Sequence, residues 1–366
     1  MFWFLQRIAI SLALLWVVTS LVFLSIYMVP GDPAELLLSG DGMTPDPASI
    51  AQLRSDLGLD RPIAAQYAER LAGLMRFDLG NSMIDGSPIG PEIAKRLPRT
   101  LELVAAAALL SLLVGIPTGV AAGLRQGSRF DRVSNVLAGF AQGIPVFVAG
   151  TIIILLFAQI WKLVPAGGYV DFTVNPGKHL ILLAMPAFAI ALGLAAIVIR
   201  IARAAVLDVL PLDYVRTARA KGLPQRRIVM RHVLRNALMP VITVFALNLG
   251  GLFGGTVLVE YVFNWPGLSG MLVSSVNSRD YPSVTAVILV ISAMFITLNL
   301  VVDIVTALLI RGSANDALTS SHLAGAADAH GDGVPPRSCP ADPRSAEDEH
   351  GTAVCPTLRC FPARAG

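Results

Sequence analysis

The densest positive charge of this 366-residue chain lies in residues 213–240, which read DYVRTARAKGLPQRRIVMRHVLRNALMP. This basic segment contains seven Lys or Arg residues and one acidic residue. Arginine presents its N–H donors in a planar fork that matches the carboxylates of a partner protein, and complementary charge directs association. The composition therefore favours docking of an acidic partner. The alternative is attraction to anionic lipid, which requires charge but no particular pattern of small residues.

The basic segment is predicted to form a short helix, a sharp turn and a second helix. Asp213 can cap the first helix, Gly222 can end it in a left-handed turn, and Pro224 prevents its continuation. The second helix covers 225–238 and leads into an apolar run. Small residues near the turn would let another protein surface approach closely: Ala218, Ala220 and Gly222.

Other kinds of chemistry lack their residues in this sequence. A phosphate-binding loop needs glycines, then Lys, then Ser or Thr, but the four lysines are followed by Arg, Leu, His and Gly. Cys339, Cys355 and Cys360 all lie near the C-terminus without metal-site spacing. The apolar runs contain no clustered nucleophile and base and no paired carboxylates. We therefore expect no enzyme activity, no metal and no cofactor in this chain.

The chain that carries the basic segment has the composition of a membrane protein. Hydrophobic residues make up 54% and charged residues 14%, against about 25% charged in soluble domains. A helix needs about 20 apolar residues to cross a bilayer, and six runs predict an all-α membrane protein with six transmembrane helices. The six runs are Ile8–Val29, Leu101–Gly123, Val136–Val164, Leu180–Ile199, Val241–Val259 and Val284–Ile310. The first is too long for a signal peptide and is expected to remain as an anchor.

Lys and Arg residues near the ends of these runs predict the orientation of the chain. The connection after the second run carries three arginines, and the connection after the fourth carries nine basic residues. The short connections on the opposite side carry one basic residue each. Both termini and the basic segment are therefore expected in the cytoplasm.

Four regions are expected along the chain. They are an N-terminal anchor helix (1–29), an external loop (30–95), the membrane core (96–312) and a tail (313–366). The loop should contain two short amphipathic helices, beginning near Pro47 and Pro62, that either cap the bundle or dock an external partner. The tail is rich in Ala, Gly, Pro, Asp and Arg and is predicted to be disordered.

Polar side chains inside the apolar runs are candidates for a transport pathway, because charge within a membrane is costly. Asp303 either lines a path or pairs with a basic residue of the bundle. Asn248 and Gln142 are milder cases with the same two interpretations. The fifth run also contains two overlapping Gly-xxx-Gly pairs, which allow close helix packing. These glycines are Gly250, Gly251, Gly254 and Gly255.

Several short motifs occur along the chain. In the basic segment the order is Ala218-x-Ala220-x-Gly222, followed later by Pro240. Elsewhere the chain contains VPGDPA, LGLDRP, DLGNS, RLPRTLEL and VFNWPGLSGMLVSSVNSRDYP. These motifs resemble those of ABC-importer permeases for dipeptides, oligopeptides and nickel, and the first resembles the EAA loop of that family. The chain departs from the family after the last run, where Ile310-Arg311-Gly312 replaces the usual Asp-Pro-Arg.

The resemblance implies a type-1 ABC-importer permease in a bacterial inner membrane, which moves peptides by alternating access. Nickel or another small solute is the alternative cargo, and a secondary transporter the alternative mechanism. The implied partners are a second, similar permease, two ATPase subunits that hydrolyse ATP, an external substrate-binding protein and membrane lipid, but no nucleic acid. The implied ATPase-coupling residues are Asp213, Tyr214, Arg216, Ala218, Arg219, Ala220, Lys221, Gly222 and Pro240.

Overall fold

The computed structural model describes residues 2–28, 35, 46–56, 60–76 and 78–328, and within this part the chain is built from helices. The only strand-like pairing among these described residues is an isolated bridge between Asn81 and Pro88. The all-α prediction is thereby confirmed. The helices are α1 (Phe2–Met28), α3 (Pro47–Asp56), α4 (Ile63–Met75), α5 (Ile89–Leu124), α6 (Arg129–Gly143), α7 (Val146–Ile153), η1 (Ile154–Ile160), α8 (Pro176–Val209), α9 (Asp213–Ala220), α10 (Gln225–Ile228), η2 (Val229–Val233), α11 (Leu234–Val262), α12 (Leu268–Asn277) and α13 (Tyr281–Asp328).

Among the described residues, five helices are long and apolar enough to cross a membrane: α1, α5, α8, the continuous α10–η2–α11 helix, and α13. The predicted third span, Val136–Val164, is not one helix, because α6 and α7 meet at an angle of 109°. Ile144 has extended backbone, and Pro145 precedes the first turn of α7. This is expected, because a proline disfavours helical backbone at the residue before it. Five of the six predicted spans therefore correspond to single helices long and apolar enough to cross a membrane, and the third corresponds to a bent helix pair.

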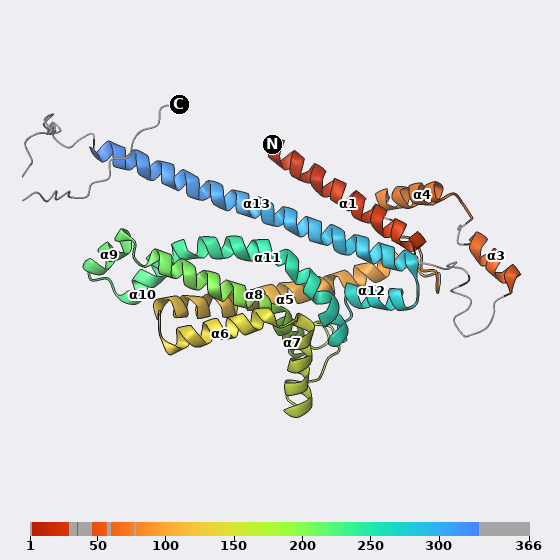
Figure 1. The fold of residues 1–366 in the computed structure, drawn as a ribbon, viewed down its shortest axis with the longest axis horizontal. Helices are drawn as coiled ribbons and strands as arrows, with labels where there is room; N and C mark the ends of the chain where they lie inside the picture. Colours follow the sequence, from red (N-terminus) through yellow and green to blue (C-terminus); the bar gives the residue numbers. More distant parts are fainter. Residues whose placement is uncertain (1, 29–34, 36–45, 57–59, 77, 329–366) are drawn as a thin grey trace, which may run out of the picture. The chain divides into compact units, whose positions relative to one another are not determined.

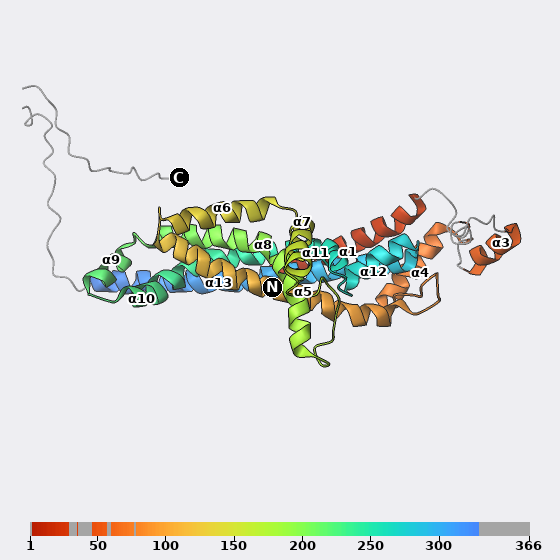
Figure 2. The ribbon, with the colours of Figure 1, turned by 90° about the horizontal axis from the view of Figure 1, so that it is seen from below.

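Helix α8 lies at the centre of the bundle. It contacts α5, α6, α7 and α11, and Figures 1 and 2 both show α5 and α6 beside it. The α5–α8 contact is close because three buried glycines of α5, spaced by four residues, face α8: Gly115, Gly119 and Gly123. A Cβ atom built on Gly119 would lie 2.5 Å from the carbonyl oxygen of Ile199. These glycines form a Gly-xxx-Gly series that allows close helix packing, and sequence reasoning missed it.

The two ends of the bundle have separate cores. At one end, α9 and α10 lie against the last turns of α5 and α8. At the other end, Ile89 and Ile93 of α5 pack with Leu268 of α12 and with Ala286 and Val287 of α13. Helix α8 runs without a break from Pro176 to Val209, with Pro186 inside it, and so connects the basic segment to the main core of the bundle.

The two short helices that the sequence predicts between residues 30 and 95 are present as α3 and α4. Tyr67 of α4 places its hydroxyl 2.6 Å from Ser20 Oγ of α1, and its ring contacts Phe23. Arg70 of α4 donates to the backbone oxygen of Pro282, 3.2 Å away. Helix α4 thus joins α1 to the start of α13, which supports the capping interpretation for α4. Docking of an external partner there stays a prediction.

Helix α13 continues beyond the predicted boundary at residue 312. Residues 313–328, predicted as part of a disordered tail, are helical. This stretch is rich in alanine, which has the highest helix propensity, and it follows directly on an established helix. The rest of the predicted tail, 329–366, lies outside the described residues.

Candidate functional site

The basic segment folds into a helix, a turn and a second helix, as the sequence predicts. Asp213 is the first residue of α9 and not its cap, because Leu212 occupies the N-cap position without a side-chain hydrogen bond. The carboxylate of Asp213 is 97% exposed and lies 3.8 Å from Arg216 Nη1. It still carries negative charge in the first turn of α9, where the helix dipole favours it.

The turn at Gly222 has the predicted left-handed backbone, with φ of +72°. The Gly222 N–H donates to the carbonyl of Arg219 at 2.9 Å, and the Leu223 N–H donates to the carbonyl of Ala218 at 3.3 Å. These bonds satisfy carbonyls that the end of α9 would otherwise leave unpaired. Pro224 then takes the N-cap position of α10. The turn is therefore fixed by backbone geometry that glycine adopts without strain.

The inner face of α9 is buried against α8 and α10. Val215 and Ala218, three residues apart, are 0% and 5% exposed and pack with Val206, Val209 and Ile228. The sequence predicts that Ala218 lies at the surface near the turn, beside Ala220 and Gly222. Only the latter two are exposed. Ala218 shares the inner helical face with Val215, so its small side chain lets α9 approach α8.

The outer face of the segment is basic and open. Five cationic side chains on α9, the turn and α10 are exposed: Arg216, Arg219, Lys221, Arg226 and Arg227. Asp213 is the only acidic residue between positions 213 and 240. Such a surface attracts an acidic partner and repels a basic one.

Both ends of the basic segment join membrane helices. The chain enters it from α8 and leaves through α10 and the π-helical η2 into α11. Tyr214 of α9 accepts a hydrogen bond from Asn236 Nδ2 of α11 at 2.6 Å. Pro240 lies inside α11, where it has no N–H to donate to the carbonyl four residues earlier. The segment is therefore attached to two spans by covalent and side-chain contacts.

The three predicted pathway residues lie on different helices and have different neighbours. Asp303 of α13 pairs with Arg7 of α1, with 2.5 Å between Oδ2 and Nη1. Of the two interpretations of Asp303, the structure therefore shows the pairing with a basic residue of the bundle. Gln142 of α6 accepts from Arg200 Nη1 at 2.8 Å. Asn248 of α11 donates to the Val244 carbonyl and lines a hollow of about 260 Å³ between α8 and α11. A pathway role for the three residues stays a prediction.

The predicted packing glycines of α11 divide into two pairs. Gly250 is buried, and a Cβ atom built on it would lie 2.9 Å from the Phe295 ring of α13, whereas Gly255 faces Val146 of α7. Gly251 and Gly254 are exposed, with nothing within 4 Å of a Cβ atom. Gly250 therefore brings α11 close to α13, whereas Gly251 lines the hollow beside Asn248.

Two polar groups that sequence reasoning missed are buried at the far end of the bundle. Glu260 is 1% exposed and accepts from Thr100 Oγ1 at 2.6 Å and from the Ser269 N–H at 2.8 Å. His179 is 1% exposed, and its Nε2 lies 2.7 Å from Glu102 Oε1. Glu260 lies one residue beyond the predicted fifth run, which is why a search for charge within the runs did not find it. In the part of the chain that the structure describes, no three His, Cys, Asp or Glu side chains gather as a metal ion would require.

Two family models match the chain. The model described as binding-protein-dependent transport system inner membrane component matches residues 115–314, and the model of its N-terminal region matches residues 1–104. The dipeptide transport system permease protein DppB of Escherichia coli (strain K12) is 36% identical over 323 residues, covering 82% of this chain and 95% of the relative. The glutathione transport system permease protein GsiC of Salmonella choleraesuis (strain SC-B67) is 38% identical over 303 residues, covering 83% and 95%. Among solved structures, an amino acid ABC transporter with histidines aligns with a TM-score of 0.41 and 16% identity over 59% of this chain and 94% of that one.

Proposed function

The chain belongs to the binding-protein-dependent transport system inner membrane components, the permease family of ABC importers. We propose that it imports short peptides and that the basic segment transmits the energy of ATP hydrolysis to it. The protein is a multi-pass inner membrane subunit of such an importer, and importers of this family work with ATPase and substrate-binding partners. The assembly we propose contains a second, similar permease, two ATPase subunits and one external binding protein. Hydrolysis takes place on the ATPase subunits, so this chain itself performs no covalent chemistry.

The observation that carries the coupling role is the two-sided character of α9. Its outer face presents exposed arginines, while its inner face is buried on α8 through Val215 and Ala218. Closely packed interiors transmit displacement because they have little free volume. When the ATPase subunits close on ATP, a push on the outer face therefore moves the end of α8, and the spans change from one access state to the other.

Peptide cargo is supported by the relatives, whose names specify dipeptides and glutathione. Dipeptides and glutathione are both short peptides with a free amino and a free carboxyl group. We expect a strain that depends on this importer to accumulate tritium-labelled dialanine, and excess unlabelled dipeptide or glutathione to reduce that uptake. Uptake of nickel with no uptake of dialanine would overturn the peptide assignment and support the alternative cargo.

The orientation that accompanies this function places residues 30–95 outside the cell and the basic segment in the cytoplasm. In a variant without the three native cysteines, Ile84→Cys should react with a membrane-impermeant maleimide in intact cells. Gln126→Cys, in the α5–α6 turn, should react only after permeabilisation. Ile84 and Gln126 are both exposed, so a difference in labelling between the two variants would not result from burial within the protein. The reverse pattern of labelling would contradict the topology.

A further inference from the structure

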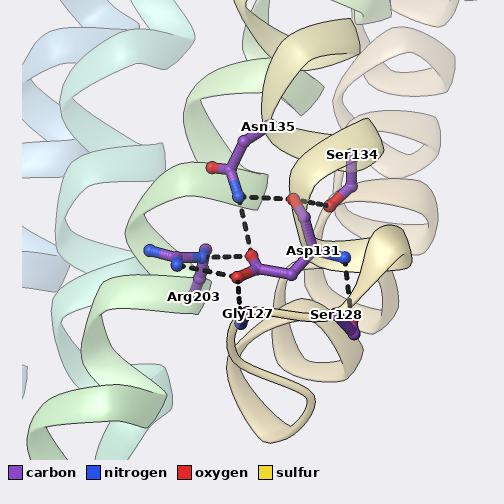
Figure 3. A network of polar contacts seen from close by, with 6 residues as sticks. All are labelled: Gly127, Ser128, Asp131, Ser134, Asn135 and Arg203. Atoms are coloured by element: carbon purple, nitrogen blue, oxygen red, sulfur yellow. Dashed lines mark hydrogen bonds and ion pairs between the residues drawn. The ribbon is translucent and has the colours of Figure 1, made fainter.

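One carboxylate, that of Asp131 in the first turn of α6, joins α6 to α8 (Figure 3). Arg203 of α8 binds it with two nitrogens, Nε to Oδ1 at 2.5 Å and Nη2 to Oδ2 at 2.9 Å. Oδ2 also accepts from the Gly127 N–H at 3.0 Å, and Oδ1 accepts from Asn135 Nδ2 at 2.8 Å. Bidentate arginine–carboxylate contacts fix orientation as well as distance.

The same residue organises the turn between α5 and α6. Ser128 caps α6 by accepting from the Asp131 N–H at 3.1 Å, and Gly127 holds a φ of +76° while it donates to the carboxylate. Asp131 is 4% exposed and Arg203 27% exposed at the side chain. Because Asp131 is buried, removing its cationic partner would leave a poorly compensated charge.

The position of this pair relates it to the basic segment. Arg203 lies one turn before Val206, which with Val209 forms the surface of α8 on which α9 packs. Val120 and Leu124, at the end of α5, pack on the same cluster. A displacement of α9 therefore reaches Arg203 within the same rigid end of α8.

The other contacts between α6 and α8 are an exposed hydrogen bond from Arg200 Nη1 to Gln142 Oε1 at 2.8 Å and apolar packing. Ala138 packs with Ala196 and Ile199, and small apolar surfaces of this kind can slide. Beyond this contact α6 turns by 109° into α7, whose Val146 lines the hollow together with Asn248 and Gly251. The Asp131–Arg203 pair is thus the charged contact between the end of α8 and the start of α6, the helix that leads to this hollow.

We propose that Asp131 and Arg203 are positioning residues for transport, which make α6 follow α8 when the ATPase subunits displace α9. The inference rests on the proposed function and assigns a coupling role to residues outside the basic segment. Without the pair, closure of the ATPase subunits still moves α9 and the end of α8, but the start of α6 no longer follows α8. ATP is then hydrolysed without import.

The test compares import with hydrolysis in proteoliposomes that contain the complete importer and its binding protein. For Arg203→Gln we expect the dialanine imported per ATP hydrolysed to fall by about tenfold or more, a change equivalent to about 1.4 kcal/mol of coupling. Arg203→Lys should recover part of the import per ATP hydrolysed, because lysine keeps the positive charge but lacks the paired N–H donors of the guanidinium group. The double swap Asp131→Arg with Arg203→Asp should recover more than either single change.

A matched control is Arg132→Gln, next to Asp131 in the sequence. Arg132 is exposed, and its contact with the Gly127 carbonyl is long, at 3.4 Å; its replacement should leave the ratio unchanged. If Arg203→Gln does not assemble, Asp131→Asn, which keeps the side-chain volume, is measured in its place, with the same fall expected.

Two results separate the claims. Import and hydrolysis that fall together, with an unchanged ratio, would mean that the pair only stabilises the fold, and the inference would be overturned. An importer with the unchanged chain that shows no ATP-dependent import would overturn the proposed function itself.

Discussion

Replacement of Gly222 by glutamate is expected to reduce peptide uptake by at least about tenfold, while the subunit still inserts into the membrane. Gly222 has a φ of +72°, which residues with a Cβ atom adopt at a cost of about 1–2 kcal/mol. Glutamate also places negative charge in the exposed basic face, opposite to the charge on which docking depends. Uptake of dialanine and the amount of ATPase subunit that co-purifies with the permease are the two measurements.

Gly222→Asn is the matched control, because asparagine adopts left-handed backbone more readily than other residues with a Cβ atom and carries no charge. Among the described residues other than its two chain neighbours, none has an atom within 4 Å of a Cβ atom built on Gly222, so neither substitution creates a clash at this atom. We expect Gly222→Asn to retain most uptake. Normal uptake together with normal ATPase retention in Gly222→Glu would show that the turn is not a docking contact.

Replacement of Gly119 by valine is expected to have a large effect on stability. A Cβ atom at this position would lie 2.5 Å from the Ile199 carbonyl oxygen and 2.7 Å from Ala202 Cβ. Because the first of these atoms belongs to the backbone, α5 and α8 would have to separate. Overpacking of this kind costs about 1–3 kcal/mol or more, and we expect the melting temperature of the detergent-purified subunit to fall by about 5 °C or more.

The control for this substitution is Gly139→Val on α6. Gly139 is also within a helix, but it is exposed, and no described residue outside its own helical turns lies within 4 Å of a Cβ atom there. Gly139→Val therefore measures the effect of the change in helix propensity without a steric clash between helices. Equal melting temperatures for the two variants would contradict the close α5–α8 contact.

The local parts of this structure could be predicted because local sequence determines them. Gly222 followed by Pro224 specifies the end of one helix and the start of the next, and the structure has both. The long apolar runs likewise specify helices. The angle at Pro145 could not be predicted from apolar length, because proline inside a span is compatible with a straight, a kinked or a broken helix.

Contacts between distant residues could not be predicted from a single sequence. Asp303 was recognisable as a polar residue in an apolar run, but nothing local identified Arg7 as its partner. Asp131 and Arg203 lie in the first turn of α6 and near the end of α8, where arginine is expected from charge bias alone. Ala218 was assigned to the surface because its size fits a contact, and only the packing of α9 on α8 shows that the contact is internal.

The central claim, that this chain imports peptides with energy received through the basic segment, is tested most directly by reconstitution. Proteoliposomes containing the two permeases, the ATPase subunits and the binding protein should accumulate labelled dialanine with ATP. They should not accumulate it with a non-hydrolysable ATP analogue or with the Gly222→Glu variant. Accumulation that persists without the ATPase subunits would contradict the account and identify a secondary transporter.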